Sequence, residues 1–115
     1  MKLSKYTHFC AFLVVIVLVL VGLVAAAGKG DPAAGKALFD KRCASCHGAL
    51  GEGKPAIAKA MKVDLRPLGS KEVQAKSDKD LIKDTTGGIG KMKGEKGLTD
   101  PQLADLIAYM RTLKP

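Results

Sequence analysis

Apolar residues are distributed unevenly along this chain of 115 residues. From Phe9 to Ala27 the chain has no charged residue and is rich in valine and leucine, whereas charged and apolar residues are mixed in the rest. At about 1.5 Å per residue, a helix over this run would be about 28 Å long, close to the hydrocarbon thickness of a bilayer. The pattern therefore divides the chain into an apolar segment, residues 1–27, and a domain over residues 28–115.

The polar pattern predicts a helix near the start of the domain. Asp31 followed by Pro32 is a typical pair for the N-cap and the first position of a helix. Apolar and small residues then recur at helical spacing, which predicts a helix over about 32–44. The next segment, 48–55, contains three glycines and a proline and is predicted to be a loop.

Two capping motifs predict the later helices. Ser77, with Asp80 three positions on, opens a helix that ends at the glycines 87–88. Thr99, with Gln102 three positions on, opens the last helix. Four apolar residues recur along this last helix and indicate a packed face: Leu103, Leu106, Ile107 and Met110.

The segments between these helices are less regular. A short helical turn is predicted over 56–61, and 64–70 is predicted to be irregular. We find no internal repeat and no alternation of apolar and polar residues long enough for a strand. The expected fold class is therefore all-α, with three to four short helices.

The apolar segment has the parts of a secretory signal peptide. Lys2 and Lys5 form a basic start, the apolar run follows, and alanines at 25–27 stand before Gly28. Small residues at this place are typical of a cleavage site, so we expect removal after Ala27 and export of the domain to the periplasm. The alternative is an uncleaved membrane anchor on the periplasmic side, and contact with a membrane is expected only in that case.

The net charge limits the choice of partners. Removing Lys2 and Lys5 leaves 17 basic and 11 acidic residues, a net charge of +6. This balance suggests docking to acidic patches on partner proteins, because opposite charges steer the encounter. Nucleic acid is not expected, since Phe39 and Tyr109 are the only aromatic residues of the domain that could stack on bases. A domain this small has a thin core, and we expect a monomer.

The chemistry of the domain is indicated by Cys43-Ala44-Ser45-Cys46-His47. Residues three apart point the same way on a helical turn, so both thiols can reach the two vinyl groups of one porphyrin, and the histidine then lies beneath the iron. A redox dithiol is typically found in a βαβ setting, and a structural zinc site needs a second pair of ligands; neither is present. The motif predicts one haem c, bound covalently through Cys43 and Cys46.

Residues 31–114 resemble the class I c-type cytochromes, of the small bacterial monohaem kind found in the periplasm. The residues that carry the resemblance are Gly35, Phe39 and Cys43 at successive fourth positions, Cys46-His47-Gly48, Asp64-Leu65, Gly90-Lys91-Met92, and the ending from Leu98-Thr99-Asp100 to Leu106-Ile107-Ala108-Tyr109-Met110-Arg111. The resemblance implies a small cytochrome c fold wrapped around one haem, with Gly35 and Phe39 crossing Leu106 and Tyr109. The haem would complete the thin core, so we expect the chain without haem to be largely unfolded.

The sixth ligand of the iron has three candidates, Met61, Met92 and Met110. Met110 lies on the apolar face of the last helix, whereas Met92 lies in the glycine-rich loop 87–94, which can place a thioether over the haem. The family has its axial methionine in this same stretch. His8 is the only other histidine and lies in the export segment. The expected iron ligands are His47 and Met92, with Met61 as the alternative and gap filling as the other role for Met92.

Three further residues bear on the haem environment. Many relatives have proline directly after the axial methionine, and Lys93 stands there instead, which predicts a softer loop and easier ligand exchange at high pH. By resemblance, the carbonyl of Pro55 accepts a hydrogen bond from the proximal imidazole; the alternative is an ordinary loop proline. Arg66 is expected either to pair with a haem propionate or to be a solvated cation.

The expected function is electron transfer by a protein that is not an enzyme. Methionine opposite histidine favours ferrous iron and leaves no open position for oxygen or peroxide. The alternative is a haem-based ligand sensor or a small peroxidase, which requires the sixth ligand to be absent or displaceable. Two groups of lysines are expected either to be simply solvated or to surround the exposed haem edge and attract an acidic partner: Lys54, Lys59 and Lys62, and Lys91, Lys93 and Lys96.

Overall fold

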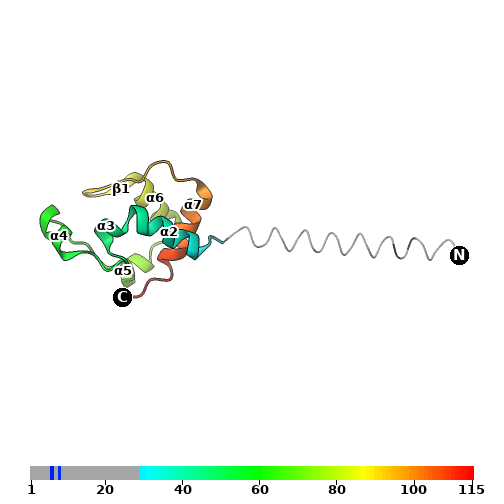
Figure 1. The fold of residues 1–115 in the computed structure, drawn as a ribbon, viewed down its shortest axis with the longest axis horizontal. Coiled ribbons are helices and arrows are strands. Elements are labelled where there is room, and N and C mark those ends of the chain that lie inside the picture. Colours follow the sequence, from blue (N-terminus) through cyan, green and yellow to red (C-terminus); the bar gives the residue numbers. More distant parts are fainter. Residues whose placement is uncertain (1–5, 7, 9–28) are drawn as a thin grey trace.

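The computed structural model describes Tyr6, His8 and residues 29–115 (Figure 1). The predicted removal of residues 1–27, and its alternative as an anchor, therefore lie outside the described residues. Within the described part, no helix is long and apolar enough to cross a membrane.

The described domain consists of helices and one small hairpin (Figure 1). In chain order the elements are α2 (Pro32–Arg42), α3 (Ala44–His47), α4 (Pro55–Met61), α5 (Lys71–Gln74), α6 (Asp78–Gly87), β1 (Gly88–Ile89), β2 (Met92–Lys93) and α7 (Asp100–Met110). The three longer helices α2, α6 and α7 match the predicted ones, and α4 matches the predicted short turn. The mostly helical fold class is confirmed, while α5 and the hairpin were not predicted.

Side-chain caps start the later helices as the sequence predicts. Thr99 and Gln102 form a full capping box at α7, in which each side chain bonds the backbone N–H of the other. At α6 the Ser77 hydroxyl accepts a bond from the Asp80 N–H at 3.1 Å, but the Asp80 carboxylate accepts from that hydroxyl and not from the backbone. The α6 motif is therefore an N-cap with a side-chain pair instead of the expected box.

The first predicted helix is interrupted one residue before its expected end. We predicted one helix over 32–44, and instead α2 ends at Arg42 and the short α3 begins at Ala44. Cys43 lies between them with φ −117° and ψ −35°, and its N–H still donates to the Phe39 carbonyl at 2.8 Å. The chain therefore turns at the first cysteine of the motif.

The core is centred where α2 crosses α7. Phe39 is 0% exposed and Leu106 is 2% exposed, and the ring centroids of Phe39 and Tyr109 lie 5.2 Å apart at an angle of 58°. At Gly35 a β-carbon would overlap the backbone of Asp105 and lie 2.9 Å from Cβ of Tyr109. The predicted close crossing of the first and last helices is confirmed, and it depends on the absence of a side chain at Gly35.

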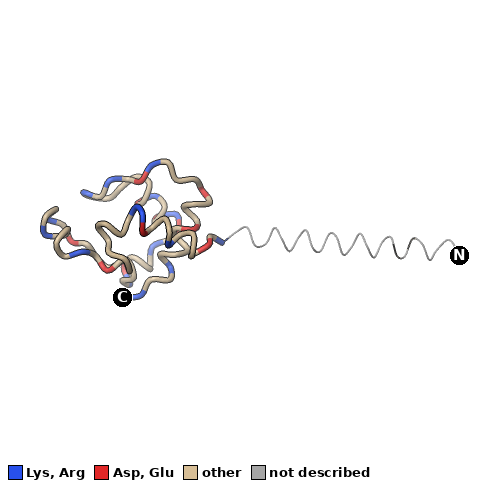
Figure 2. Tube along the Cα trace, in the orientation of Figure 1, with Lys and Arg blue, Asp and Glu red and all other residues tan. Residues whose placement is uncertain are grey.

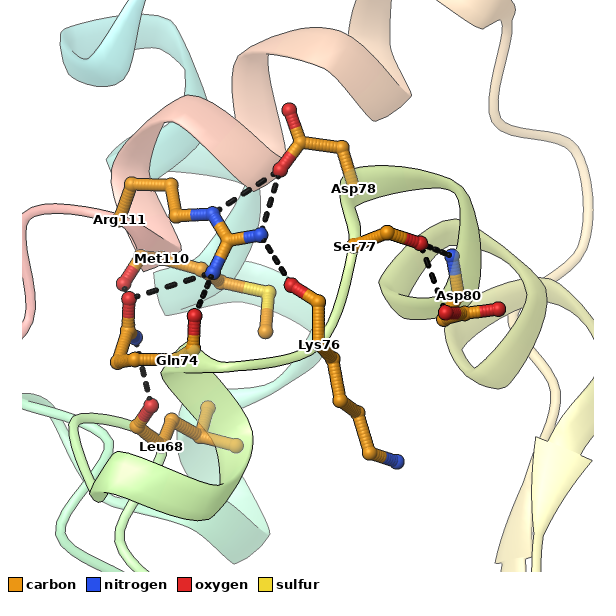
Figure 3. Close-up of polar contacts among 8 residues, drawn as sticks. All are labelled: Leu68, Gln74, Lys76, Ser77, Asp78, Asp80, Met110 and Arg111. Atoms are coloured by element: carbon orange, nitrogen blue, oxygen red, sulfur yellow. Dashed lines mark hydrogen bonds and ion pairs between the residues drawn. The ribbon is translucent and has the colours of Figure 1, made fainter.

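A network around Arg111 joins the end of α7 to the connection between α5 and α6 (Figure 3). Its guanidinium donates to the Asp78 carboxylate from two nitrogens, at 3.0 and 2.7 Å, and to the carbonyls of Gln74 and Lys76 at 2.8 and 2.6 Å. The Gln74 side chain in turn donates to the carbonyls of Leu68 and Met110. This one cation therefore satisfies one main-chain acceptor at the C-terminal end of α5 and another in the connection to α6.

The glycine-rich segment after α6 is a hairpin, not the flexible loop that we predicted. Gly88 pairs with Lys93 and Ile89 with Met92 in antiparallel register. Gly88 and Gly90 have φ of 82° and 57°, in the left-handed region that glycine adopts without strain. The hairpin was not predicted because two residues per strand are too few for a visible alternation.

Candidate functional site

The two cysteines of the motif lie on the short turn between α2 and the following loop. Cys43 and Cys46 are free thiols and half-buried, and Cys46 N–H donates to the Cys43 carbonyl at 3.2 Å. Burial raises the pKa of Cys43 to about 11, and the negative charge of Glu95 adds to this effect. The raised pKa keeps the Cys43 thiol neutral at pH 7.

The His47 imidazole ends this turn in a partly apolar environment. Its Nδ1 atom is buried and has no hydrogen-bond partner in the described structure. Burial also lowers the pKa of His47, so that the neutral form, which binds metal, is favoured. A neutral, half-buried imidazole directly after the two cysteines fits the group that the motif is expected to hold.

The loop after His47 is fixed by hydrogen bonds to the turn. Gly53 N–H donates to the His47 carbonyl at 2.6 Å and Lys54 N–H to the Cys46 carbonyl at 3.1 Å. From the last helix, the Tyr109 hydroxyl donates to the Ala49 carbonyl at 3.2 Å. The motif is therefore tied to the α2–α7 crossing by the same tyrosine that packs on its aromatic partner.

The three methionines lie in different environments. Met110 is 7% exposed and belongs to the core, in agreement with its predicted packing role. Met61 ends α4 and Met92 begins β2, and both are half-buried. The Lys91 ammonium donates to the Met61 carbonyl at 2.7 Å, so the turn of the hairpin is bonded to the end of α4.

Comparison with known proteins adds a direct finding. The sequence profile of the family described as Cytochrome c matches residues 32–114. The chain belongs to the cytochrome c family.

Individual relatives agree with this assignment. Cytochrome c-554(547) from Halothiobacillus neapolitanus is 33% identical over 90 residues, which cover 74% of this chain and 99% of that protein. Cytochrome c-555 from Chlorobaculum tepidum is 37% identical over 81 residues, covering 70% of this chain and 74% of that protein. Cytochrome c6 from Synechocystis is 37% identical over 83 residues, covering 70% of this chain and 63% of that protein.

Membership of the cytochrome c family assigns the cofactor and the type of function. Cytochromes c carry haem c, and Cys43 and Cys46 of this chain supply the two thioether bonds. The protein is an electron carrier that works with redox partner proteins, and it is not an enzyme. Bacterial cytochromes c of this kind are typically periplasmic.

The other predicted site residues of this cytochrome c lie near the motif along the chain. Pro55 is the exposed first residue of α4; because Nδ1 of His47 has no partner in the structure, the bond to the proline carbonyl stays a prediction. Arg66 is exposed and lies 3.3 Å from the Asp64 carboxylate. Its pairing with a propionate likewise stays a prediction.

Two basic residues with non-local contacts escaped our sequence analysis. Arg42, directly before the first cysteine, donates from Nη1 to the Glu95 carboxylate and to the Lys96 carbonyl, each at 3.1 Å. Lys91 belongs to one of the two predicted lysine groups, and no contact with another element was predicted for it, yet it bonds the end of α4. Periodicity and spacing give no signal for contacts between residues 53 or 30 positions apart.

Proposed function

We propose that this cytochrome c binds its haem iron through His47 and Met92 and carries electrons with both axial positions filled. Three facts support this ligand pair. His47 is the only histidine in residues 29–115, Met110 is part of the core, and Met92 lies on a hairpin that is bonded to α4 through Lys91. The hairpin contact is the observation that carries the proposal, because it holds Met92 in a defined place.

Each residue of the site then has a separate role. Cys43 and Cys46 hold the ring covalently, His47 donates its neutral imidazole, and Met92 donates a thioether. When bound, the haem supplies a reversible one-electron change between ferric and ferrous iron. With both axial positions filled by the protein, small molecules are kept from the iron.

The absorption spectrum of the haem-loaded protein tests this ligand pair. Ferric iron bound to a thioether has a weak far-red band, which we expect in the native protein and not in Met92→Ala. Met61→Ala is the matched control, because it removes the other half-buried methionine and should keep the band. Carbon monoxide should bind ferrous Met92→Ala and not the native protein. If the native protein lacks the band and binds carbon monoxide at once, the site is open, and a sensor or peroxidase replaces the electron carrier.

We further propose that the lysines on α4 and on the hairpin attract an acidic patch of the redox partner. Figure 2 shows basic residues on both segments, which lie at the end of the domain away from residue 29. Lys59 and Lys93 are exposed there, and exposed cations increase association rates in a salt-dependent way. The site and the docking surface would then share one end of the protein.

Charge reversal tests this docking surface. The double variant Lys59→Glu/Lys93→Glu leaves the Lys91 hydrogen bond intact. It should associate more slowly with an acidic redox protein, and its association rate should depend less on salt than that of the native protein. Lys29→Glu with Lys36→Glu makes the same charge change near the start of α2 and should alter the rate less. Equal effects of the two double variants would contradict a localised docking surface.

For the location, we propose export to the periplasm with cleavage after Ala27, and a monomeric product. The described structure supports a domain that begins soon after this point: Asp31 N–H donates to the Asp105 carboxylate at 2.7 Å, and a β-carbon at Gly30 would overlap the Ala104 backbone. The mass of the protein recovered from the periplasm tests the cut. A full-length protein found only with the membrane would favour the anchor.

A further inference from the structure

The segment that carries Met92 has little structure of its own. Its hairpin has two residues in each strand, and an isolated two-stranded hairpin is marginal in water. Ile89, the pairing partner of Met92, is 52% exposed, and no residue of the two strands is fully buried, so the hairpin lacks a fully buried face. The position of Met92 therefore depends on contacts outside the hairpin.

Those contacts come from three elements. The hairpin begins at the end of α6, and directly after it Glu95 N–H donates to the Thr85 carbonyl of α6 at 2.7 Å. The turn is bonded to α4 by Lys91. The third element is α2, where Arg42 donates to both Glu95 and Lys96.

The Arg42 contact differs from an ordinary surface ion pair. One nitrogen serves two acceptors, a carboxylate and a main-chain carbonyl, and the side chains of Arg42 and Glu95 are 41% and 29% exposed. By contrast, Lys36 and Asp40 on the same helix form an exposed local pair four residues apart, which contributes little to the position of any other element. Within residues 29–115, the side-chain hydrogen bonds that connect α2 to the Met92 segment are those of Arg42.

From this geometry we propose that Arg42 is a positioning residue for the axial methionine. It adjoins Cys43 in the chain and bonds the residues that follow β2. A single side chain thus links the segment that holds the haem covalently to the segment that carries Met92. The inference rests on the proposed ligand pair and assigns the residue that keeps Met92 in place.

Competition by added imidazole at neutral pH measures how firmly Met92 is held. Imidazole binds ferric iron only when the methionine has moved away, so its apparent affinity reports the fraction of displaced Met92. In the haem-loaded protein, Arg42→Gln should raise this affinity about five-fold, which corresponds to about 1 kcal/mol. Arg42→Lys, which keeps the charge opposite Glu95, should restore part of the native value.

Two further variants separate positioning from general stability. Glu95→Gln weakens the same contact and leaves Arg42, the residue next to Cys43, in place, so it should act like Arg42→Gln and remain informative if that variant fails to mature. Asp78→Asn weakens the other ion pair between distant elements, that with Arg111, and should lower stability with little change in imidazole affinity.

The possible outcomes are distinct. If the native far-red band is present and Arg42→Gln and Glu95→Gln both bind imidazole like Asp78→Asn, the role of Arg42 is refuted while Met92 remains the ligand. If the native protein lacks the band, the ligand pair fails and this role of Arg42 fails with it. A five-fold rise confined to the Arg42 and Glu95 variants supports the role.

Discussion

Placing a methyl group at the helix crossing should strongly destabilise this cytochrome c. In Gly35→Ala the new β-carbon would overlap the backbone of Asp105 and lie 2.9 Å from Cβ of Tyr109. Neither obstacle is the end of a flexible side chain, so no change of rotamer can remove the overlap. The helices α2 and α7 must move apart, and this disturbs the packing of Phe39 on Tyr109.

The size of the effect follows from three contributions. Overpacking of a rigid site costs up to about 3 kcal/mol, and partial loss of an aromatic pair adds about 0.5 kcal/mol or more. Alanine in place of glycine inside a helix returns about 1 kcal/mol. The free energy of unfolding should therefore fall by about 2.5 kcal/mol, equivalent to a decrease in Tm of about 10–20 °C for a domain of this size.

Guanidinium and thermal unfolding of the haem-loaded protein, followed by circular dichroism, measure this change. Gly87→Ala is the matched control: it is also a helical glycine, but its β-carbon would have nothing within 4 Å, so its stability should be unchanged or higher by up to about 1 kcal/mol. If Gly35→Ala is as stable as the native protein, or if Gly87→Ala loses as much, the close crossing does not limit stability as we argue.

Two further predictions concern other parts of the fold. Arg111→Ala should lower the free energy of unfolding by about 2–3 kcal/mol, because it leaves carbonyls and a carboxylate without their donor. Asp78→Asn, which removes only the charge of the carboxylate, should lower it by about 1 kcal/mol or less. Equal losses of the two variants in chemical unfolding would contradict the importance of the carbonyl bonds. Backbone hydrogen bonds lower the pKa of the Glu52 carboxyl from 4.5, so its contribution to stability is present above pH 4.5 and is lost as the pH falls through the lowered pKa. Native protein and Glu52→Gln should therefore differ at pH 7 and converge in acid, and a difference that persists at low pH would disprove this linkage.

The features that the sequence predicted are those with local causes. Asp31 with Pro32, and Thr99 with Gln102, start their helices through contacts within a few residues, so spacing alone reveals them. The CxxCH motif is equally local. The crossing at Gly35 was predicted from the resemblance to a known family. The sequence around this glycine shows only that two helices could pack closely there.

The features that sequence analysis missed depend on distant segments. The helix α5 has four residues and gives too little periodicity to detect. The hairpin at Met92 is held by α6, α4 and α2, and its contacts with Arg42 and Lys91 span 53 and 30 positions. Arg66 differs from Arg42 and Lys91, because its contact in the structure is with a residue close to it in the sequence, Asp64.

The attachment of Asp31 to Asp105 has a consequence for handling the protein. It fixes the start of the domain on α7, and Figure 1 shows that α4 and the hairpin lie at the opposite end. A linker joined at residue 29 would therefore orient the molecule on an electrode with its lysine-bearing end facing solution. Immobilisation through a single point could then preserve exchange with a soluble redox protein, whereas coupling through surface lysines would block it.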